Sequence, residues 1–166
     1  TFLLAQGKAV GKSLGEHDLI DEARRALASA EAKGVQVILP VDVIVAKEVT
    51  RGTEYKTLPA EKIPASWHIV DLGKASQDLI VDALSDMKTV FWNGPMGVFE
   101  IPSFAHGTKA VARILADRAA AGATGCAEDR RTTRCAATFA STPRFQVAGN
   151  AAAGDPGHWR ADQAFA

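Results

Sequence analysis

Residues 69–92, IVDLGKASQDLIVDALSDMKTVFW, show a strand pattern, a helix pattern and a second strand pattern in direct succession. Residues 69–72 form a short apolar run that ends at Gly73, and residues 89–92 form a second run. Between the two runs a helix is predicted from about Ser76, a residue type that favours the N-cap position, to Met87. This strand, helix, strand unit is typical of α/β folds.

The segments before this unit extend the alternation of helices and strands. Residues 17–33 place apolar side chains on one face of a predicted amphipathic helix, which a glycine ends. Residues 35–39 and 41–46, separated by a proline, are predicted as two strands, and the second is apolar enough to be buried on both faces. Residues 50–66 are polar and contain two prolines and a glycine, which predicts a surface loop.

The segments after the unit complete the pattern. Residues 93–97 form a turn rich in glycine and proline, and residues 104–120 form another predicted helix. Because strands alternate with helices, we expect an α/β fold with a mostly parallel sheet. Ligand sites in such folds lie beyond the carboxyl ends of the strands, and the turn that follows Trp92 holds such a position.

Composition excludes several classes of protein. The chain has 166 residues, of which 47% are hydrophobic, and its 19 basic side chains balance 19 acidic ones. This neutral charge lacks the basic excess that binding to nucleic acid or to an anionic membrane requires. No apolar run approaches the roughly 18 residues that span a bilayer, and the chain shows no secretory signal pattern. We therefore expect a soluble, cytoplasmic protein without nucleic-acid or membrane partners.

The chain changes character after Leu115, which is the last leucine or isoleucine. All nine lysines lie between Lys8 and Lys109, and residues 126–166 contain eleven alanines and five arginines. A segment with so little apolar surface does not offset a backbone ordering entropy of about 1–2 kcal/mol per residue. We expect a compact front part and a poorly ordered tail. The two cysteines lie in this tail at a spacing that fits no redox pair or zinc site, and we interpret them as inert thiols.

Residues 7–13, GKAVGKS, resemble the phosphate-binding pattern GxxxxGKS of P-loop proteins. The spacer here is three residues, one short of the length that wraps the phosphates, and the preceding TFLLAQ looks as helical as strand-like. The alternative interpretation is a turn that enters the next helix, with Ser13 and Glu16 at the spacing of a capping box. A P-loop nucleotide hydrolase would require Lys12 to contribute to ATP binding.

Residues 92–100, WNGPMGVFE, are the strongest candidate for a ligand site. Glycines and a proline set an unusual backbone path that lets a ligand approach the main chain. Asn93 offers amide donors for a phosphate or sugar oxygen, and Glu100 accepts hydrogen bonds from a ribose diol. Val98 and Phe99 supply apolar walls for a base. Physical reasoning alone leaves open a strand-end turn with an ordinary surface glutamate.

Other polar residues carry weaker signals. The four histidines are dispersed and have no second ligand at metal-binding spacing, so we interpret them as surface or hydrogen-bonded residues: His17, His68, His106 and His158. Asp42 and Asp71 lie within or at the end of predicted strands, where either carboxylate would be able to face a ligand crevice.

Six segments together resemble the nucleotide-binding lobe of phosphoglycerate kinase. The segments keep the family's order and similar spacing, and they are TFL at 1–3, VGKSL at 10–14, LPVDVIVA at 39–46, DLG at 71–73, WNGPMGVFE at 92–100 and GTKA at 107–110, with Phe104 before the last. The resemblance covers about residues 1–121 and has a bacterial character. It implies a Rossmann-like three-layer lobe, here incomplete, over residues 1–122, and assigns VGKSL a structural role.

The resemblance also implies a function. Members of the family transfer a phosphoryl group between 1,3-bisphosphoglycerate and magnesium ADP in glycolysis, and the whole enzyme is usually a monomer of two lobes. When the family's binding roles are transferred to the matching positions of this sequence, the resemblance implies that Glu100 binds the ribose hydroxyls and Val98 touches the adenine. It also implies that Asn93 and Pro95 line the phosphates and sugar. The implied ligands are ATP or ADP with Mg²⁺, and the implied partner is the N-terminal lobe.

The family's remaining machinery is absent from the sequence. A GGGDS or GGGDT segment, whose aspartate holds the nucleotide's magnesium, and an STGGGAS segment do not occur. Because phosphoryl transfer depends on positioning and charge stabilisation, we expect no catalytic residues, no metal site and no turnover in this chain alone. Residues 123–166 resemble no family segment, which suggests a frameshift. The alternative is a non-catalytic nucleotide-binding or interaction module derived from the lobe.

Overall fold

The computed structural model describes residues 1–127 and 145–147. The helices are α1 (Phe2–Ala5), α2 (Ile20–Ala32), α3 (Lys74–Leu84) and α4 (His106–Ala120), with single turns η1 (His17–Leu19) and η2 (Pro102–Phe104). The strands are β1 (Asp42–Ala46), β2 (Tyr55–Pro59), β3 (His68–Leu72), β4 (Thr89–Trp92), β5 (Thr124–Ala127) and β6 (Phe145–Val147). The expectation of a poorly ordered tail falls mostly on residues outside the described ranges, and Cys135 and His158 are among them.

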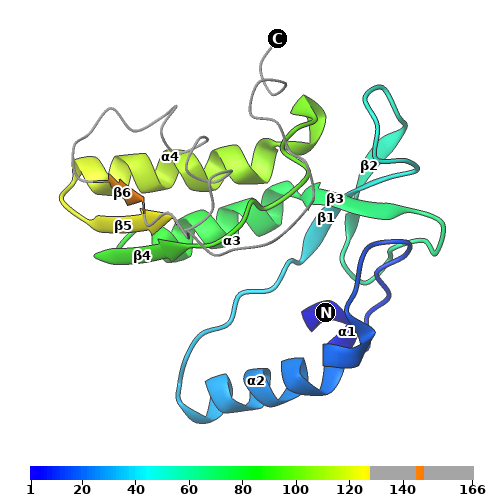
Figure 1. Cartoon of the computed structure of the whole chain (residues 1–166), viewed down its shortest axis with the longest axis horizontal. Helices are drawn as coiled ribbons and strands as arrows, with labels where there is room; N and C mark the ends of the chain where they lie inside the picture. Colours follow the sequence, from blue (N-terminus) through cyan, green and yellow to red (C-terminus); the bar gives the residue numbers. More distant parts are fainter. Residues whose placement is uncertain (128–144, 148–166) are drawn as a thin grey trace, which may run out of the picture.

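The described strands form two sheets, and the α/β class is confirmed (Figure 1). The first sheet has the order β2-β1-β3 and is antiparallel throughout, with Val43 opposite both Leu58 and Leu72. The second has the order β4-β5-β6 and is parallel. The expectation of a mostly parallel sheet is not confirmed: one sheet is parallel and the other antiparallel, and β3 and β4, the strands of the central unit, belong to different sheets. Apolar periodicity predicts extended backbone but does not specify which strand it pairs with.

Side chains from α3, α4 and β4 form one core. Its buried members are Trp92, Val111, Ala112 and Leu115. Ile80 and Leu84 of α3 pack against this cluster, and the two helices lie side by side in Figure 1. Helix α4 leads from β4 towards its parallel neighbour β5, which is the usual crossover connection of parallel strands.

The predicted amphipathic helices are confirmed, with small changes at their ends. Residues 17–33 form η1 followed by α2, and residues 104–120 form the end of η2 followed by α4. Their boundaries differ from the prediction because single turns of 3₁₀-helix precede both α-helices. Helical periodicity therefore located both elements.

Ser76 does not cap α3, contrary to the expectation. The helix begins at Lys74, and Ser76 is buried inside its first turn. The carboxylate of Asp42 accepts hydrogen bonds from the amides of Ala75 (3.2 Å) and Ser76 (2.7 Å). The Ser76 hydroxyl instead accepts from the amides of Val41 and Asp42, each at 2.9 Å. A residue distant in sequence thus satisfies the helix terminus and attaches α3 to β1.

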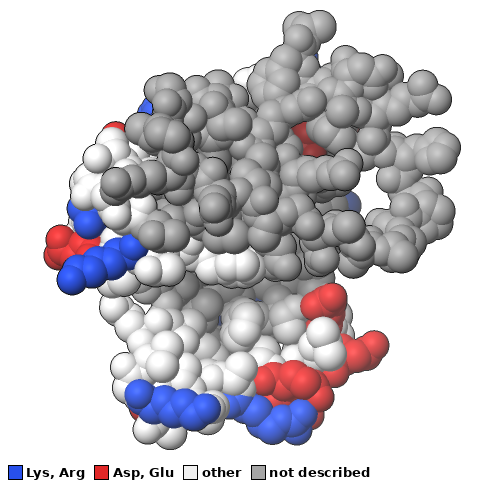
Figure 2. All heavy atoms as spheres, turned by 60° about the vertical axis from the view of Figure 1, so that its left-hand side comes forward, with Lys and Arg blue, Asp and Glu red and all other residues white. Residues whose placement is uncertain are grey.

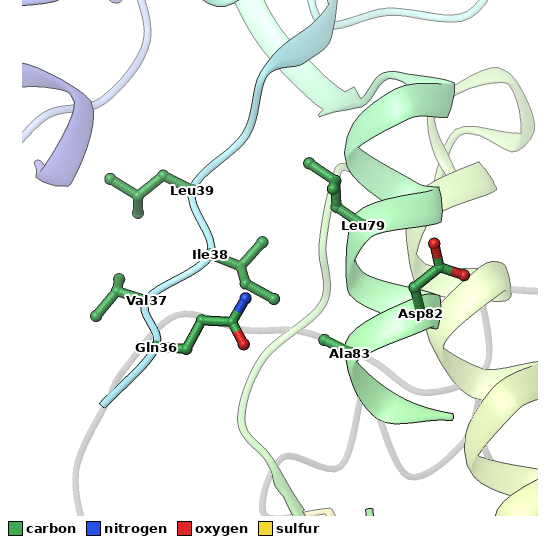
Figure 3. Close-up of a pocket in the computed structure, with 7 residues that line it drawn as sticks. All are labelled: Gln36, Val37, Ile38, Leu39, Leu79, Asp82 and Ala83. Atoms are coloured by element: carbon green, nitrogen blue, oxygen red, sulfur yellow. The ribbon is translucent and has the colours of Figure 1, made fainter. Parts of the chain in front are cut away.

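Residues 35–39 are extended but are not a strand, so this part of the prediction is wrong. Figure 3 shows alternating side chains: Gln36 and Ile38 point towards α3, whereas Val37 and Leu39 point away from it. Residues 36–39 and Leu79, Asp82 and Ala83 of α3 line a groove of about 370 Å³. Within the described residues this backbone has no ladder partner, and a strand requires one.

Residues 50–66 are not only a loop, because β2 lies within them. This strand pairs antiparallel with β1, and Lys56 opposes Val45. Most of its side chains are exposed, and β2 is an edge strand of the described sheet. An exposed edge strand needs no apolar alternation, so the sequence pattern did not reveal it. Pro59 ends the strand, a position that proline tolerates.

Residues 7–13 form a structural turn against β3. Gly11 has a φ of 60° and forms an isolated bridge with His68. The amide of Lys12 donates to the carbonyl of Trp67 (2.8 Å), and the Ser13 hydroxyl accepts from the amide of Ile69 (2.7 Å). Ser13 is therefore not part of a capping box, contrary to the expectation. The Lys12 amide donates within the protein, an arrangement unlike a phosphate-binding loop.

The described surface carries charges of both signs. Figure 2 shows acidic and basic side chains next to each other on one face. Two ion pairs lie along α2, Arg24–Asp21 at 3.0 Å and Arg25–Glu22 at 2.7 Å. None of the described helices has both the length and the hydrophobicity needed to cross a membrane.

Candidate functional site

The loop of residues 93–100, called here the glycine loop, leads from β4 towards η2 and packs against β3 of the other sheet. It begins directly after Trp92, which is buried at the end of β4. Gly94 adopts a φ of 76° with open space around it, a conformation that favours glycine. The chain then turns away from β4 and reaches β3 of the other sheet. The loop is thus held at both ends by regular structure.

Backbone hydrogen bonds hold the glycine loop against β3 and α4. The amide of Met96 donates to the hydroxyl of Thr108 in α4 (3.1 Å), and Thr108 is fully buried. The amide of Val98 donates to the carbonyl of Val70 in β3 (2.8 Å). A tight turn closes the loop where the amide of Ile101 donates to the carbonyl of Val98 (3.0 Å). These contacts give the loop a defined path.

The four residues predicted to bind a nucleotide all lie on this loop. Asn93 is exposed, whereas Pro95, Val98 and Glu100 are half-buried. Val98 packs against the core cluster that contains Phe104. Glu100 lies within the tight turn at the end of the loop. The structure therefore presents the four side chains from one segment; their contact with a nucleotide stays a prediction.

Asp71 and Asp42 do not face a crevice as free carboxylates. Asp71 is 1% exposed and accepts hydrogen bonds from the amides of Leu72 (2.8 Å) and Gly107 (3.1 Å). Burial raises the pKa of Asp71 above its ordinary value, although these hydrogen bonds act in the opposite direction. The pKa of Asp42 is lowered: partial burial raises it, but hydrogen bonds from Ser76 and Ala75 outweigh burial. Each carboxylate holds the start of a helix.

These pKa shifts predict opposite effects of pH on stability. In the native state Asp71 binds protons more readily than in the unfolded chain. Its contribution to the free energy of unfolding is therefore largest below its unfolded pKa of 3.8 and falls as pH rises. The free energy of unfolding of wild type relative to Asp71→Asn should therefore decrease as pH rises from about 3 to about 7. Urea unfolding of both proteins across this range measures the difference.

Asp42→Asn provides the matched comparison. Because the pKa of Asp42 is lowered in the native state, its contribution to the free energy of unfolding is present above its unfolded pKa of 3.8 and is lost as pH falls below it. Relative to Asp42→Asn, wild-type stability should therefore increase with rising pH. If the stability differences between wild type and the two variants changed in the same direction with pH, the prediction would be contradicted.

The described residues do not form a metal site. They contain no group of three or more His, Cys, Asp or Glu side chains able to hold an ion. The three described histidines are dispersed: His17 and His106 are exposed and His68 is half-buried. Because amides occupy Asp71, this carboxylate is not a free metal ligand either.

Sequence reasoning missed the contacts that hold the glycine loop. Thr108 and Gly107 of α4 take part in these contacts, and Gly97 is where the loop approaches β3, yet none was singled out as a site residue. A Cβ atom on Gly97 would lie 2.5 Å from Oδ1 of Asp71 and 2.6 Å from the Val70 carbonyl oxygen. The available signal was the glycine in both WNGPMG and HGTKA, since close backbone approach is a common reason for glycine.

Comparisons with curated proteins give one consistent family. The family model described as phosphoglycerate kinase matches residues 1–147. The chain is 52% identical over 117 residues to the phosphoglycerate kinase of Pelotomaculum thermopropionicum. It is 48% identical over 116 residues to that of Thermus thermophilus. Both alignments cover 70% of this chain, and the chain spans about 30% of the length of these relatives.

Solved structures support the same assignment. The phosphoglycerate kinase of Coxiella burnetii superposes with a TM-score of 0.80 at 32% identity, over 88% of this chain and 37% of that chain. The enzyme of Pyrococcus horikoshii superposes with a TM-score of 0.64 at 23% identity, over 88% of this chain and 36% of that chain, which is a likeness of fold. The family-model match and the curated relatives agree: the chain belongs to the phosphoglycerate kinase family.

Proposed function

We propose that the glycine loop binds the nucleoside part of ATP or ADP. The observation that carries the proposal is the path of the loop, which leaves a buried strand and is tethered to Val70 and Thr108. In this proposal Glu100 accepts hydrogen bonds from the ribose hydroxyls and Val98 contacts the adenine. Asn93 and Pro95 line the sugar and phosphates. A loop held in advance loses little entropy on binding, which favours its use as a recognition segment.

The proposed reaction is that of the family. The nucleotide would exchange a phosphoryl group with 1,3-bisphosphoglycerate, a step of glycolysis in the cytoplasm, with an N-terminal lobe as the partner that binds the phosphoglycerate. The supporting observations are the family match and the fold; the chain spans about 30% of its curated relatives. We propose that this chain alone has no turnover, because phosphoryl transfer requires several cationic groups and amide donors around the transferring group.

Magnesium belongs to the proposal only as the ion that accompanies the nucleotide phosphates. The described residues do not fit a resident magnesium site, because they lack a cluster of carboxylates and Asp71 is occupied by amides. Mg²⁺ prefers oxygen ligands and keeps several waters, and nucleotide phosphates supply such oxygens. Glu100 would thus contact the organic part of the ligand, and Asn93 would line its sugar and phosphates.

Glu100→Gln tests the proposed site. We expect it to weaken ADP binding about tenfold or more, because hydrogen bonds to a charged acceptor are worth about 1.5–3 kcal/mol. Binding of ADP to the whole chain is measured by NMR titration in the millimolar range. ADP that lacks both ribose hydroxyls should bind wild type and Glu100→Gln equally. The matched control is Glu31→Gln, which changes an exposed glutamate on α2.

Two results would contradict this assignment. If Glu100→Gln weakened ADP and the dideoxy nucleotide to the same extent, Glu100 would not read the ribose. If wild type failed to bind ADP, the loop would not be a nucleotide site in this chain. Formation of ATP from 1,3-bisphosphoglycerate and ADP by the purified chain would overturn the proposed lack of turnover.

A further inference from the structure

We propose that Asp71 is a positioning residue for the glycine loop: its buried carboxylate joins the end of β3, Gly97 of the loop and the start of α4. The proposal rests on the proposed function, because it makes Asp71 a determinant of nucleotide binding without contact with the nucleotide. Three contacts meet at this carboxylate.

The first two contacts are hydrogen bonds to backbone amides. Oδ1 of Asp71 accepts from the amide of Leu72, the next residue of β3, at 2.8 Å. Oδ2 accepts from the amide of Gly107 at 3.1 Å, 36 residues further along the sequence. Gly107 lies in the first turn of α4, where amides lack partners within the helix and where the helix dipole favours a negative charge. The carboxylate therefore fixes α4 relative to β3.

The third contact is the close approach of the glycine loop. A Cβ atom on Gly97 would lie 2.5 Å from Oδ1 of Asp71, closer than real Cβ contacts come. The loop backbone therefore packs directly against the carboxylate, and the neighbouring amide of Val98 is bonded to Val70. Because Thr108 of α4 also holds the amide of Met96, the loop lies between two elements that Asp71 connects.

Burial explains why this arrangement acts on the loop rather than on a ligand. Asp71 is 1% exposed and Thr108 is fully buried, so neither side chain reaches a bound molecule. The Gly107 amide is already bonded and does not serve as a phosphate donor. Val98 belongs to the anchored segment of residues 96–98, and Glu100 lies farther along the same loop, so the placement of both depends on that segment.

The test compares Asp71→Asn with Asp42→Asn in the whole chain. The asparagine keeps the size of the side chain but places an NH₂ group where a carboxylate oxygen accepts from an amide. Hydrogen exchange followed by NMR should show about 10- to 100-fold faster exchange at the amides of Val98 and Gly107 in Asp71→Asn. The amide of Val45 in β1 should change less than about threefold. ADP affinity should fall about tenfold in the same variant.

Asp42→Asn is the matched control, because Asp42 also holds a helix start but touches α3 instead of α4. It should leave the exchange of Val98 and the affinity for ADP unchanged. If amide hydrogen exchange in Asp71→Asn became faster by the same factor at Val98, Gly107 and Val45, the variant would show a general loss of stability, and the proposal would be overturned. Unchanged exchange at Val98 and Gly107 would overturn it as well.

Gly97→Ala tests the same contact from the side of the loop. If Asp71→Asn did not fold, this variant should still accelerate exchange at Val98 relative to Val45 and weaken ADP binding, and failure to do so would overturn the proposal. The exchange measurement needs no nucleotide. Absence of ADP binding by wild type would therefore count against the proposed function, while the exchange data would still decide whether Asp71 holds the loop.

Discussion

Replacing Gly11 by alanine is expected to lower the free energy of unfolding by about 3–5 kcal/mol. Gly11 has a φ of 60°, and an added Cβ would overlap the carbonyl oxygen of Trp67 and lie 2.7 Å from that of Pro64. A left-handed conformation costs a non-glycine residue about 1–2 kcal/mol, and the overlap with rigid backbone adds to it. Since domains are stable by about 5–15 kcal/mol, urea unfolding should show a much lower midpoint.

Gly52→Ala is the matched control for this prediction. Gly52 has a φ of 77°, but a Cβ there would meet no atom within 4 Å. Its substitution carries the conformational penalty alone, about 1–2 kcal/mol. If the two variants were equally destabilised, the contact between residues 11 and 67 would not be the reason for the effect.

Replacing Phe104 by alanine is expected to cost about 3–5 kcal/mol, the usual range for a buried phenylalanine. Phe104 is 1% exposed and forms a core cluster with Ile44, Ala46 and Val70, which belong to β1 and β3. Tyr55 of β2 adds an edge-on ring contact at 5.6 Å between ring centroids. The substitution would leave a cavity, because the lost phenyl ring contacts all three strands of the first sheet. Urea unfolding measures the loss.

Phe91→Ala makes the same chemical change at a site that is 62% exposed. It should lower stability by about 0.5 kcal/mol or less, as surface substitutions usually do. Because Val98 packs against the cluster of Phe104, Phe104→Ala should also weaken ADP binding, whereas Phe91→Ala should not. Similar losses of stability for both variants would contradict the assignment of Phe104 to the core.

The glycine loop was predictable and its supports were not. A turn of glycine and proline directly after an apolar strand indicates a ligand position in α/β folds, and the motif pointed to the family. Asp71 was visible only as a carboxylate at the end of a strand. Its bond to Gly107 spans 36 residues, and no local pattern encodes such a contact. The Asp42–Ser76 contact likewise replaced a local helix cap with a distant one.

The positions of α2 and α4, the extended backbone of β1, β3 and β4, and the family of the chain could all be predicted from the amino-acid sequence. These features follow from residue periodicity and motif spacing, which are local properties. Three features became visible only in the folded chain: β1 and β3 pair antiparallel, β3 and β4 lie in different sheets, and residues 35–39 have no partner among the described strands. Strand pairing and buried hydrogen bonds depend on residues far apart in sequence, so their energies are settled only when the whole chain is packed.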